Sequence, residues 1–140
     1  NEGYREYARR LPRECRLNLT EIPLAQRVRS KTVQRAVTEE GERMLAELSP
    51  GDCVIALDVK GRSWSTEQLA EQLQQWMLEG RGICLLVGGP DGLSDACLER
   101  AQQRWSLSPL TLPHPLVRVL LAEQLYRAWT VMVGHPYHRA

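Results

Sequence analysis

Two short, continuously apolar runs constrain the fold of this chain more than any other feature. They are CVIAL at residues 53–57 and ICLLV at residues 83–87. A turn sequence, SPGD at residues 49–52, precedes the first run, and Gly80 and Gly82 precede the second. Unbroken apolar runs of this length are typical of strands that are covered on both faces in a parallel sheet.

Segments with helical spacing surround these runs. Residues 2–11 and 32–48 each place apolar residues on one helical face, and further helices are expected to begin at Ser65, Ser94 and Pro115. Shorter strands are expected at residues 16–22 and 105–112, and residues 24–31 form a basic segment. Strand and helix therefore alternate, which predicts an α/β fold with a mostly parallel open sheet flanked by helices on both faces.

Three of these expected helices have further features: a cap, an internal glycine and a wide apolar face. Ser65 is expected to cap its helix in a reciprocal arrangement with Gln68. Gly41 lies inside the 32–48 helix, where we expect it to cost about 1 kcal/mol relative to alanine. The helix after Pro115 has an apolar face too wide for one small sheet, so we expect part of it to contact a second subunit.

Composition favours a single soluble domain. The chain has 140 residues, of which 43% are hydrophobic, and this predicts one domain over residues 1–140. No apolar run approaches the roughly 20 residues needed to cross a bilayer, so we expect a cytoplasmic protein without a membrane anchor. We also expect reduced thiols and no metal site, because no CxxC pair and no histidine at zinc-ligand spacing accompany the cysteines Cys15, Cys53, Cys84 and Cys97.

Charge is distributed unevenly along the chain. Residues 1–35 carry nine basic and four acidic side chains, a local balance of +5, whereas the whole chain has a formal charge of +1. Clustered Lys and Arg side chains gain affinity for RNA by releasing counterions from its phosphates. The asymmetry therefore predicts contact with RNA, although arginine stems lying over the edge of a helical core would produce the same pattern.

Three loops are expected at the carboxyl ends of the strands. They are LDVKG at 57–61, GGPDG at 88–92 and LSPLTL at 107–112. Ligands bind at this edge of a parallel sheet, so the loops predict a binding site. The glycines of the second loop allow backbone N–H groups to approach a ligand, but they equally suit a tight turn. Neither GxGxxG nor GxxxxGK[ST] is present, which leaves little support for a nucleotide-hydrolysing site.

Longer motifs carry a family resemblance. The runs LTLPHPLVR at 110–118, EQLYRA at 123–128 and HPYHR at 135–139 resemble the bacterial ribosomal large-subunit pseudouridine N3-methyltransferases, as do the loops at 57–61 and 88–92. On this resemblance the chain is identified as a member of the SPOUT methyltransferases over essentially its whole length. Members of the family open with a further β-strand, so the resemblance also implies that this first strand is missing here.

The resemblance implies a deep trefoil knot towards the C-terminus, a homodimer, and S-adenosylmethionine as cofactor. It places the cofactor contacts at Leu57, Gly88, Gly89, Leu107, Ser108, Pro109, Leu110, Thr111 and Leu112. The implied substrate is N3 of a pseudouridine in 23S rRNA. A domain this small offers few contacts for reading a base sequence, so we expect it to recognise the assembled ribosome. The alternative is a catalytically inactive, ribosome-associated RNA-binding module.

Methylating an imide nitrogen requires a group that takes or stabilises its proton. The candidates are His114 for positioning or proton acceptance, Arg127 for an anion or phosphate contact, and a tail closing over the nucleotide, formed by Tyr137, His138 and Arg139. Each candidate has a structural alternative. His114 is also placed to cap a helix, Arg127 to form an i,i+4 pair with Glu123, and the tail to be an ordinary chain end.

Overall fold

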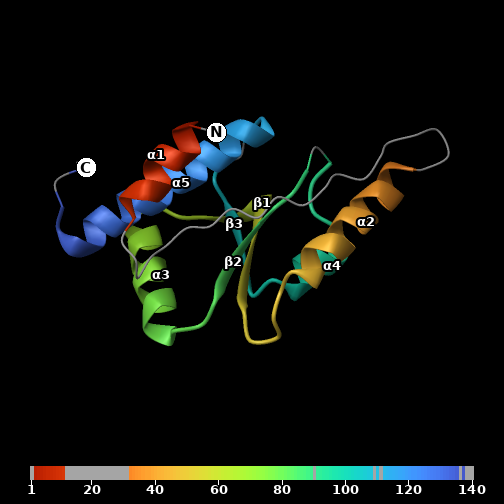
Figure 1. Ribbon diagram of the computed structural model, residues 1–140, viewed down its shortest axis with the longest axis horizontal. Coiled ribbons are helices and arrows are strands. Elements are labelled where there is room, and N and C mark those ends of the chain that lie inside the picture. Colours follow the sequence, from red (N-terminus) through yellow and green to blue (C-terminus); the bar gives the residue numbers. More distant parts are fainter. Residues whose placement is uncertain are drawn as a thin grey trace. The chain divides into compact units, whose positions relative to one another are not determined.

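The computed structural model describes residues 2–11, 32–89, 91–108, 110, 112–135 and 137. The chain divides into two compact units. The helical unit comprises Asn1–Leu19, Ser63–Gly80 and Leu110–Ala140, and the sheet unit comprises Thr20–Arg62 and Arg81–Pro109. Figure 1 labels the elements, which are α1 (Glu2–Arg10), α2 (Val33–Ala46), β1 (Cys53–Ser63), α3 (Thr66–Glu79), β2 (Ile83–Val87), α4 (Asp95–Arg100), β3 (Gln103–Ser106) and α5 (His114–Val133).

The two apolar runs form neighbouring parallel strands, as the sequence predicts. Within the described residues the sheet has three strands in the order β2-β1-β3, and β1 pairs with β2 in parallel from Cys53 opposite Ile83 to Leu57 opposite Val87. Two expectations need correction. β1 continues beyond residue 57 to Ser63, and β3 covers residues 103–106 instead of 105–112. The strand expected at 16–22 and the basic segment at 24–31 lie outside the described residues.

The core of the sheet unit lies between the strands and two helices. Val54, Leu86 and Cys97 are buried together, and partly buried side chains pack against them (Met44, Leu45, Leu48, Cys84, Leu93 and Ala101). Figure 1 shows the corresponding arrangement, with α2 lying beside α4. The α/β fold, a sheet flanked by helices, is therefore confirmed.

The glycine inside α2 allows α2 and α4 to pack closely. Gly41 is buried, and a Cβ at this position would lie 2.8 Å from the Cβ of Ser94 and against its Oγ. Ser94 is itself buried, and its Oγ accepts a hydrogen bond from the Cys97 N–H at 3.2 Å to cap α4. Gly41 is thus required by the helix contact, which the sequence alone did not indicate.

The helical unit is built around α5. Figure 1 shows α1 lying along α5, and α3 also packs on α5. These two helices account for much of the wide apolar face of α5, which the sequence analysis assigned in part to a second subunit. Leu121, Leu125 and Ala128 are buried, whereas Leu116 and Val133 at the two ends of α5 remain exposed.

Predicted helix boundaries in this unit are close to those observed. Ser65 and Gln68 form the expected capping box, with the Gln68 N–H donating to Ser65 Oγ at 3.1 Å and the Ser65 N–H donating to Gln68 Oε1 at 2.9 Å. α5 begins one residue earlier than expected, at His114. Among the described parts of the chain, no helix is long and apolar enough to span a membrane.

Candidate functional site

β2 ends beside the middle of β1, so residues 57–61 are part of a strand and the prediction of a loop there is wrong. Leu57 is the register partner of Val87, the last residue of β2, so Gly88 leaves the sheet next to Leu57. Leu57 is half-buried and lies within β1 instead of at its end. The structure therefore brings together two of the predicted cofactor positions, Leu57 and Gly88.

The glycine loop is a closed tight turn. The Gly92 N–H donates to the carbonyl oxygen of Gly89 at 3.1 Å, and Gly92 has a φ of +84°. A Cβ on Gly88 would lie 2.6 Å from the carbonyl carbon of Gly92. The loop therefore forms the tight turn that its glycines suit. Its backbone approaches itself so closely that Gly88 has no room for a side chain.

The third candidate loop begins after β3, which is the neighbour of β1 on the side opposite β2. Leu107 and Ser108 are half-buried, and Ser108 O accepts a hydrogen bond from Ser106 Oγ at 3.0 Å. Leu110 and Leu112 belong to the helical unit, where Leu110 is 68% exposed. Pro109 and Thr111 lie outside the described residues.

The predicted catalytic residues are divided between the two ends of α5. His114 is the first helical residue and Pro113 is the N-cap, so His114 is not the capping residue. Arg127 lies 13 residues later on the same helix, which places it about 20 Å away along the axis at the α-helical rise. His138 and Arg139 lie outside the described residues.

Arg127 and Tyr137 come together in one cluster. The Arg127 guanidinium carbon lies 5.0 Å from the centroid of the Tyr137 ring. The Tyr137 ring also meets the Tyr126 ring edge-on, at 4.8 Å between centroids. Such contacts combine a cation with the negative faces of aromatic rings, and they anchor Tyr137 to the C-terminal half of α5.

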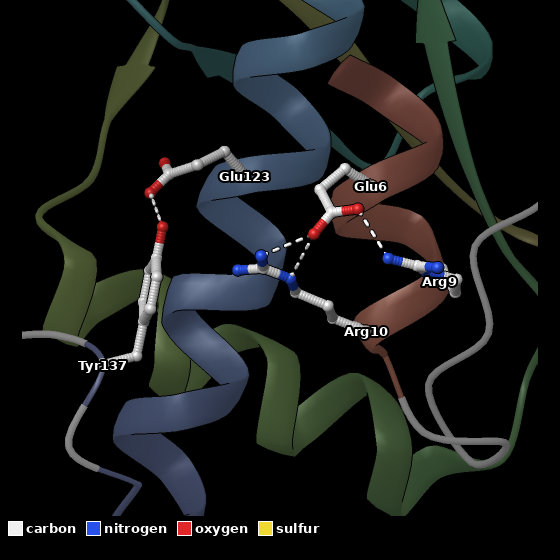
Figure 2. A network of polar contacts seen from close by, with 5 residues as sticks. All are labelled: Glu6, Arg9, Arg10, Glu123 and Tyr137. Carbon is white, nitrogen blue, oxygen red and sulfur yellow. Dashed lines mark hydrogen bonds and ion pairs between the residues drawn. The ribbon is translucent and has the colours of Figure 1, made fainter. Parts of the chain in front are cut away.

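Glu123 connects these two residues. Its Oε1 accepts hydrogen bonds from Arg127 Nε at 2.8 Å and from the Tyr137 hydroxyl at 3.3 Å, the second of which Figure 2 shows. The predicted i,i+4 ion pair is also present, with Arg127 Nη2 at 2.5 Å from the same oxygen. The side chains of Glu123 and Arg127 are only 13% and 29% exposed, so solvent screens this pair weakly.

The cluster has clear consequences for protonation. Burial, a hydrogen bond with Tyr7 and the charge of Glu123 together raise the pKa of Tyr137 to about 12. The hydrogen bond with Glu123 raises the pKa of Arg127 above its usual value. At neutral pH Tyr137 is therefore a hydrogen-bond donor and Arg127 a fixed cation.

Helix α1 supplies a second side of the cluster that the sequence analysis missed. The Arg10 guanidinium carbon lies 5.4 Å from the ring centroid of Tyr7 and 5.6 Å from that of Tyr126. Glu6 accepts hydrogen bonds from Arg10 Nε at 3.0 Å and from Arg9 Nη2 at 2.6 Å (Figure 2). Tyr7 and Arg10 are three residues apart on one helical face, and this spacing was the available signal.

We call Tyr7, Arg10, Tyr126, Arg127 and Tyr137 the tyrosine–arginine cluster. It offers hydrogen-bond donors and cations but no metal ligands. Across the described portion of the chain, no group of three or more His, Cys, Asp or Glu side chains is arranged to hold a metal ion. Cys53 and Cys97 are buried thiols, as expected, Cys84 is a half-buried one, and Cys15 lies outside the described residues.

Comparison with known proteins decides the family. The family model described as "Predicted SPOUT methyltransferase" matches residues 1–138. The chain belongs to the SPOUT methyltransferase family. Proteins named ribosomal RNA large subunit methyltransferase H are similar to this SPOUT chain over 99% of its length. Those of Hahella chejuensis, Methylococcus capsulatus and Azotobacter vinelandii are 59%, 61% and 57% identical to it, and the matches cover 88%, 90% and 89% of those proteins.

Proposed function

We propose that this SPOUT chain uses S-adenosylmethionine to methylate N3 of a pseudouridine in the 23S rRNA of the large ribosomal subunit, in the cytoplasm. The observation that carries this proposal is an identity of 57% to 61% to proteins named ribosomal RNA large subunit methyltransferase H, over nearly the whole chain. Family membership makes a methyl donor necessary. S-adenosylmethionine is the donor that the sequence resemblance implies.

The residues around the end of β2 fit this cofactor chemically. Gly88 and Gly89 carry no side chains, so an adenine edge could approach those backbone groups of the loop that the turn itself does not use. The half-buried side chains of Leu57 and Leu107 provide apolar surface. When bound, S-adenosylmethionine supplies a methyl group on a positively charged sulfur.

The other candidates would act on the base. The imide nitrogen carries a proton that has to leave as the methyl group arrives, and we assign its acceptance or positioning to His114. Arg127 would stabilise the anion that develops on the imide. Tyr137 would hold the tail in place, because its hydroxyl, which a pKa of about 12 keeps protonated at neutral pH, donates its proton to Glu123. His138 and Arg139 would close over the nucleotide.

These assignments need two copies of the chain. His114 and Arg127 act on one base only if they come close together, whereas one α5 separates their backbone positions by about 20 Å along its axis. We therefore propose a homodimer in which the start of α5 from one subunit and the end of α5 from the other share a pocket. Each subunit would be a single domain over residues 1–140 that contains the trefoil knot.

Methyl transfer to ribosomes that lack the modification tests the function. We expect transfer to assembled ribosomes and to the large subunit, with calorimetry showing S-adenosylmethionine binding at the micromolar level. An inactive RNA-binding module would bind the ribosome but transfer no methyl group. That result, obtained with an intact dimer, would overturn the proposal.

Mixed dimers test the shared pocket. His114→Ala and Tyr137→Phe chains are each expected to lose most activity as homodimers. Unfolding and refolding them together should place one intact site in each mixed dimer and restore about a quarter of the wild-type activity. Activity no higher than the mean of the two parents would show that each subunit uses only its own residues.

A further inference from the structure

The carboxylate of Glu123 receives hydrogen bonds from two of the residues proposed to act on the base. Its Oε1 accepts from Arg127 and from the Tyr137 hydroxyl, and its Oε2 accepts from Gln124 Nε2 at 2.8 Å. From this geometry we infer that Glu123 is a positioning residue, which fixes the Arg127 guanidinium and anchors the C-terminal tail through Tyr137. The inference rests on the proposed function, since it assigns Glu123 a task in the same reaction.

The environment of Glu123 distinguishes it from an ordinary surface carboxylate. Its side chain is 13% exposed, whereas that of Glu6, which also holds two partners, is 40% exposed. Exposed ion pairs contribute little because water and salt screen them, whereas charge-assisted hydrogen bonds in a shielded site are stronger and more directional. Figure 2 draws both carboxylates, with Glu123 bonded to Tyr137 and Glu6 bonded to Arg9 and Arg10.

Anchoring Tyr137 limits where the end of the chain can reach. His138 and Arg139 follow Tyr137 directly in the sequence, so the anchor at Tyr137 fixes the point from which they continue. A tail released from Glu123 would search a much larger volume and would meet the base in the productive arrangement less often. The cost would therefore appear in the rate of the chemical step.

The position of the anchor along α5 agrees with this task. Tyr126, three residues after Glu123, receives the Tyr137 ring edge-on, and the Arg10 guanidinium lies over Tyr126 from α1. The Tyr137 ring is thus fixed by aromatic contacts and its hydroxyl by Glu123. Loss of Glu123 alone would leave the ring packed but would release the hydroxyl and the guanidinium.

The test replaces Glu123 by glutamine in the full-length chain. Glu123→Gln keeps the size of the side chain and removes its charge. We expect kcat for methyl transfer to ribosomes to fall about tenfold or more, because the guanidinium and tail lose their fixed orientation. The Kd for S-adenosylmethionine should stay within about twofold, since the proposed cofactor loops do not include Glu123. The matched control is Glu39→Gln, which removes the i,i+4 carboxylate partner of Arg35 in α2, outside the tyrosine–arginine cluster, and should leave kcat within about twofold.

A double-mutant cycle separates positioning from a general loss of stability. If Glu123 acts through Tyr137, then Glu123→Gln in a Tyr137→Phe background should reduce kcat much less than in the wild type. Tyrosine ring signals in the NMR spectrum of ¹³C-labelled protein provide a readout that is independent of catalysis. We expect the Tyr137 signal to shift in Glu123→Gln and to stay unchanged in Glu39→Gln.

The outcomes are distinguishable. Unchanged kcat in Glu123→Gln would overturn the positioning role, and losses that multiply independently in the double variant would overturn the action through Tyr137. An unchanged Tyr137 signal in Glu123→Gln would overturn the anchor itself. Absence of methyl transfer by the unmodified protein would instead overturn the proposed function, and the NMR comparison would still decide the anchor.

Discussion

Replacing Gly41 by alanine tests the packing of α2 against α4. Helix propensity alone predicts a gain of about 1 kcal/mol from this change in a helix interior. The structure predicts the opposite, because the new methyl group would lie 2.8 Å from Ser94 Cβ and 3.4 Å from Cys97 Sγ. Overpacking of a filled core costs about 1 to 3 kcal/mol. Displacing the capping hydroxyl of Ser94 costs about 1 kcal/mol more.

The net expectation is a loss of about 2 kcal/mol in the free energy of unfolding. Urea denaturation followed by circular dichroism measures it. Gly51→Ala is the control, because no atom lies within 4 Å of a Cβ at that position, and its effect should stay within about 0.5 kcal/mol. Gly41→Ala should also cost less in a Ser94→Gly background, where the opposing side chain is absent. A stabilised Gly41→Ala protein would refute the reasoning.

Three further predictions concern the loop, a helix cap and the tail. Gly88→Ala should weaken S-adenosylmethionine binding at least tenfold in calorimetry, because its Cβ would meet the backbone of Gly92 at 2.6 Å and distort the turn. Unchanged affinity would show that the turn is not part of the cofactor site. Ser65→Ala should lower the unfolding free energy by about 1 kcal/mol, because it removes the hydroxyl that caps α3; an unchanged urea midpoint would contradict this. The pKa of Tyr137 is raised to about 12 in the folded protein, above about 10 for an unfolded tyrosine. The folded state therefore holds its proton more tightly, and stability should fall between pH 10 and 12, less steeply in Tyr137→Phe.

Much of the fold follows from the sequence because local patterns and tertiary packing agree. The apolar runs at 53–57 and 83–87 form the paired parts of β1 and β2. They are continuously apolar, as is typical of parallel strands, whereas a strand with one face in water alternates apolar and polar residues. The capping box at Ser65 is a purely local arrangement and is predicted in full. The need for glycine at position 41 could not be predicted from the local sequence, because the residue that it contacts, Ser94, lies more than 50 residues away in the chain.

The candidate site is predictable only in part, for the same physical reason. The glycine loop and Arg127 stand out by composition and by motif, but their contacts depend on packing between distant segments. Tyr7 reaches the Tyr126 ring, at 6.2 Å between centroids, only because α1 packs on α5. The width of the apolar face of α5 was interpreted as evidence for a second subunit, and much of it is covered within the chain by α1 and α3.

The glycine turn after β2 is closed before any ligand arrives. Gly92 is already bonded to Gly89, and Ser94 just beyond it is buried beneath α2. Ordering a loose loop costs roughly 1 to 2 kcal/mol of conformational entropy per residue, which subtracts from affinity. A preformed turn avoids that loss, so the loop should recognise a ligand by complementary shape, with little rearrangement on binding.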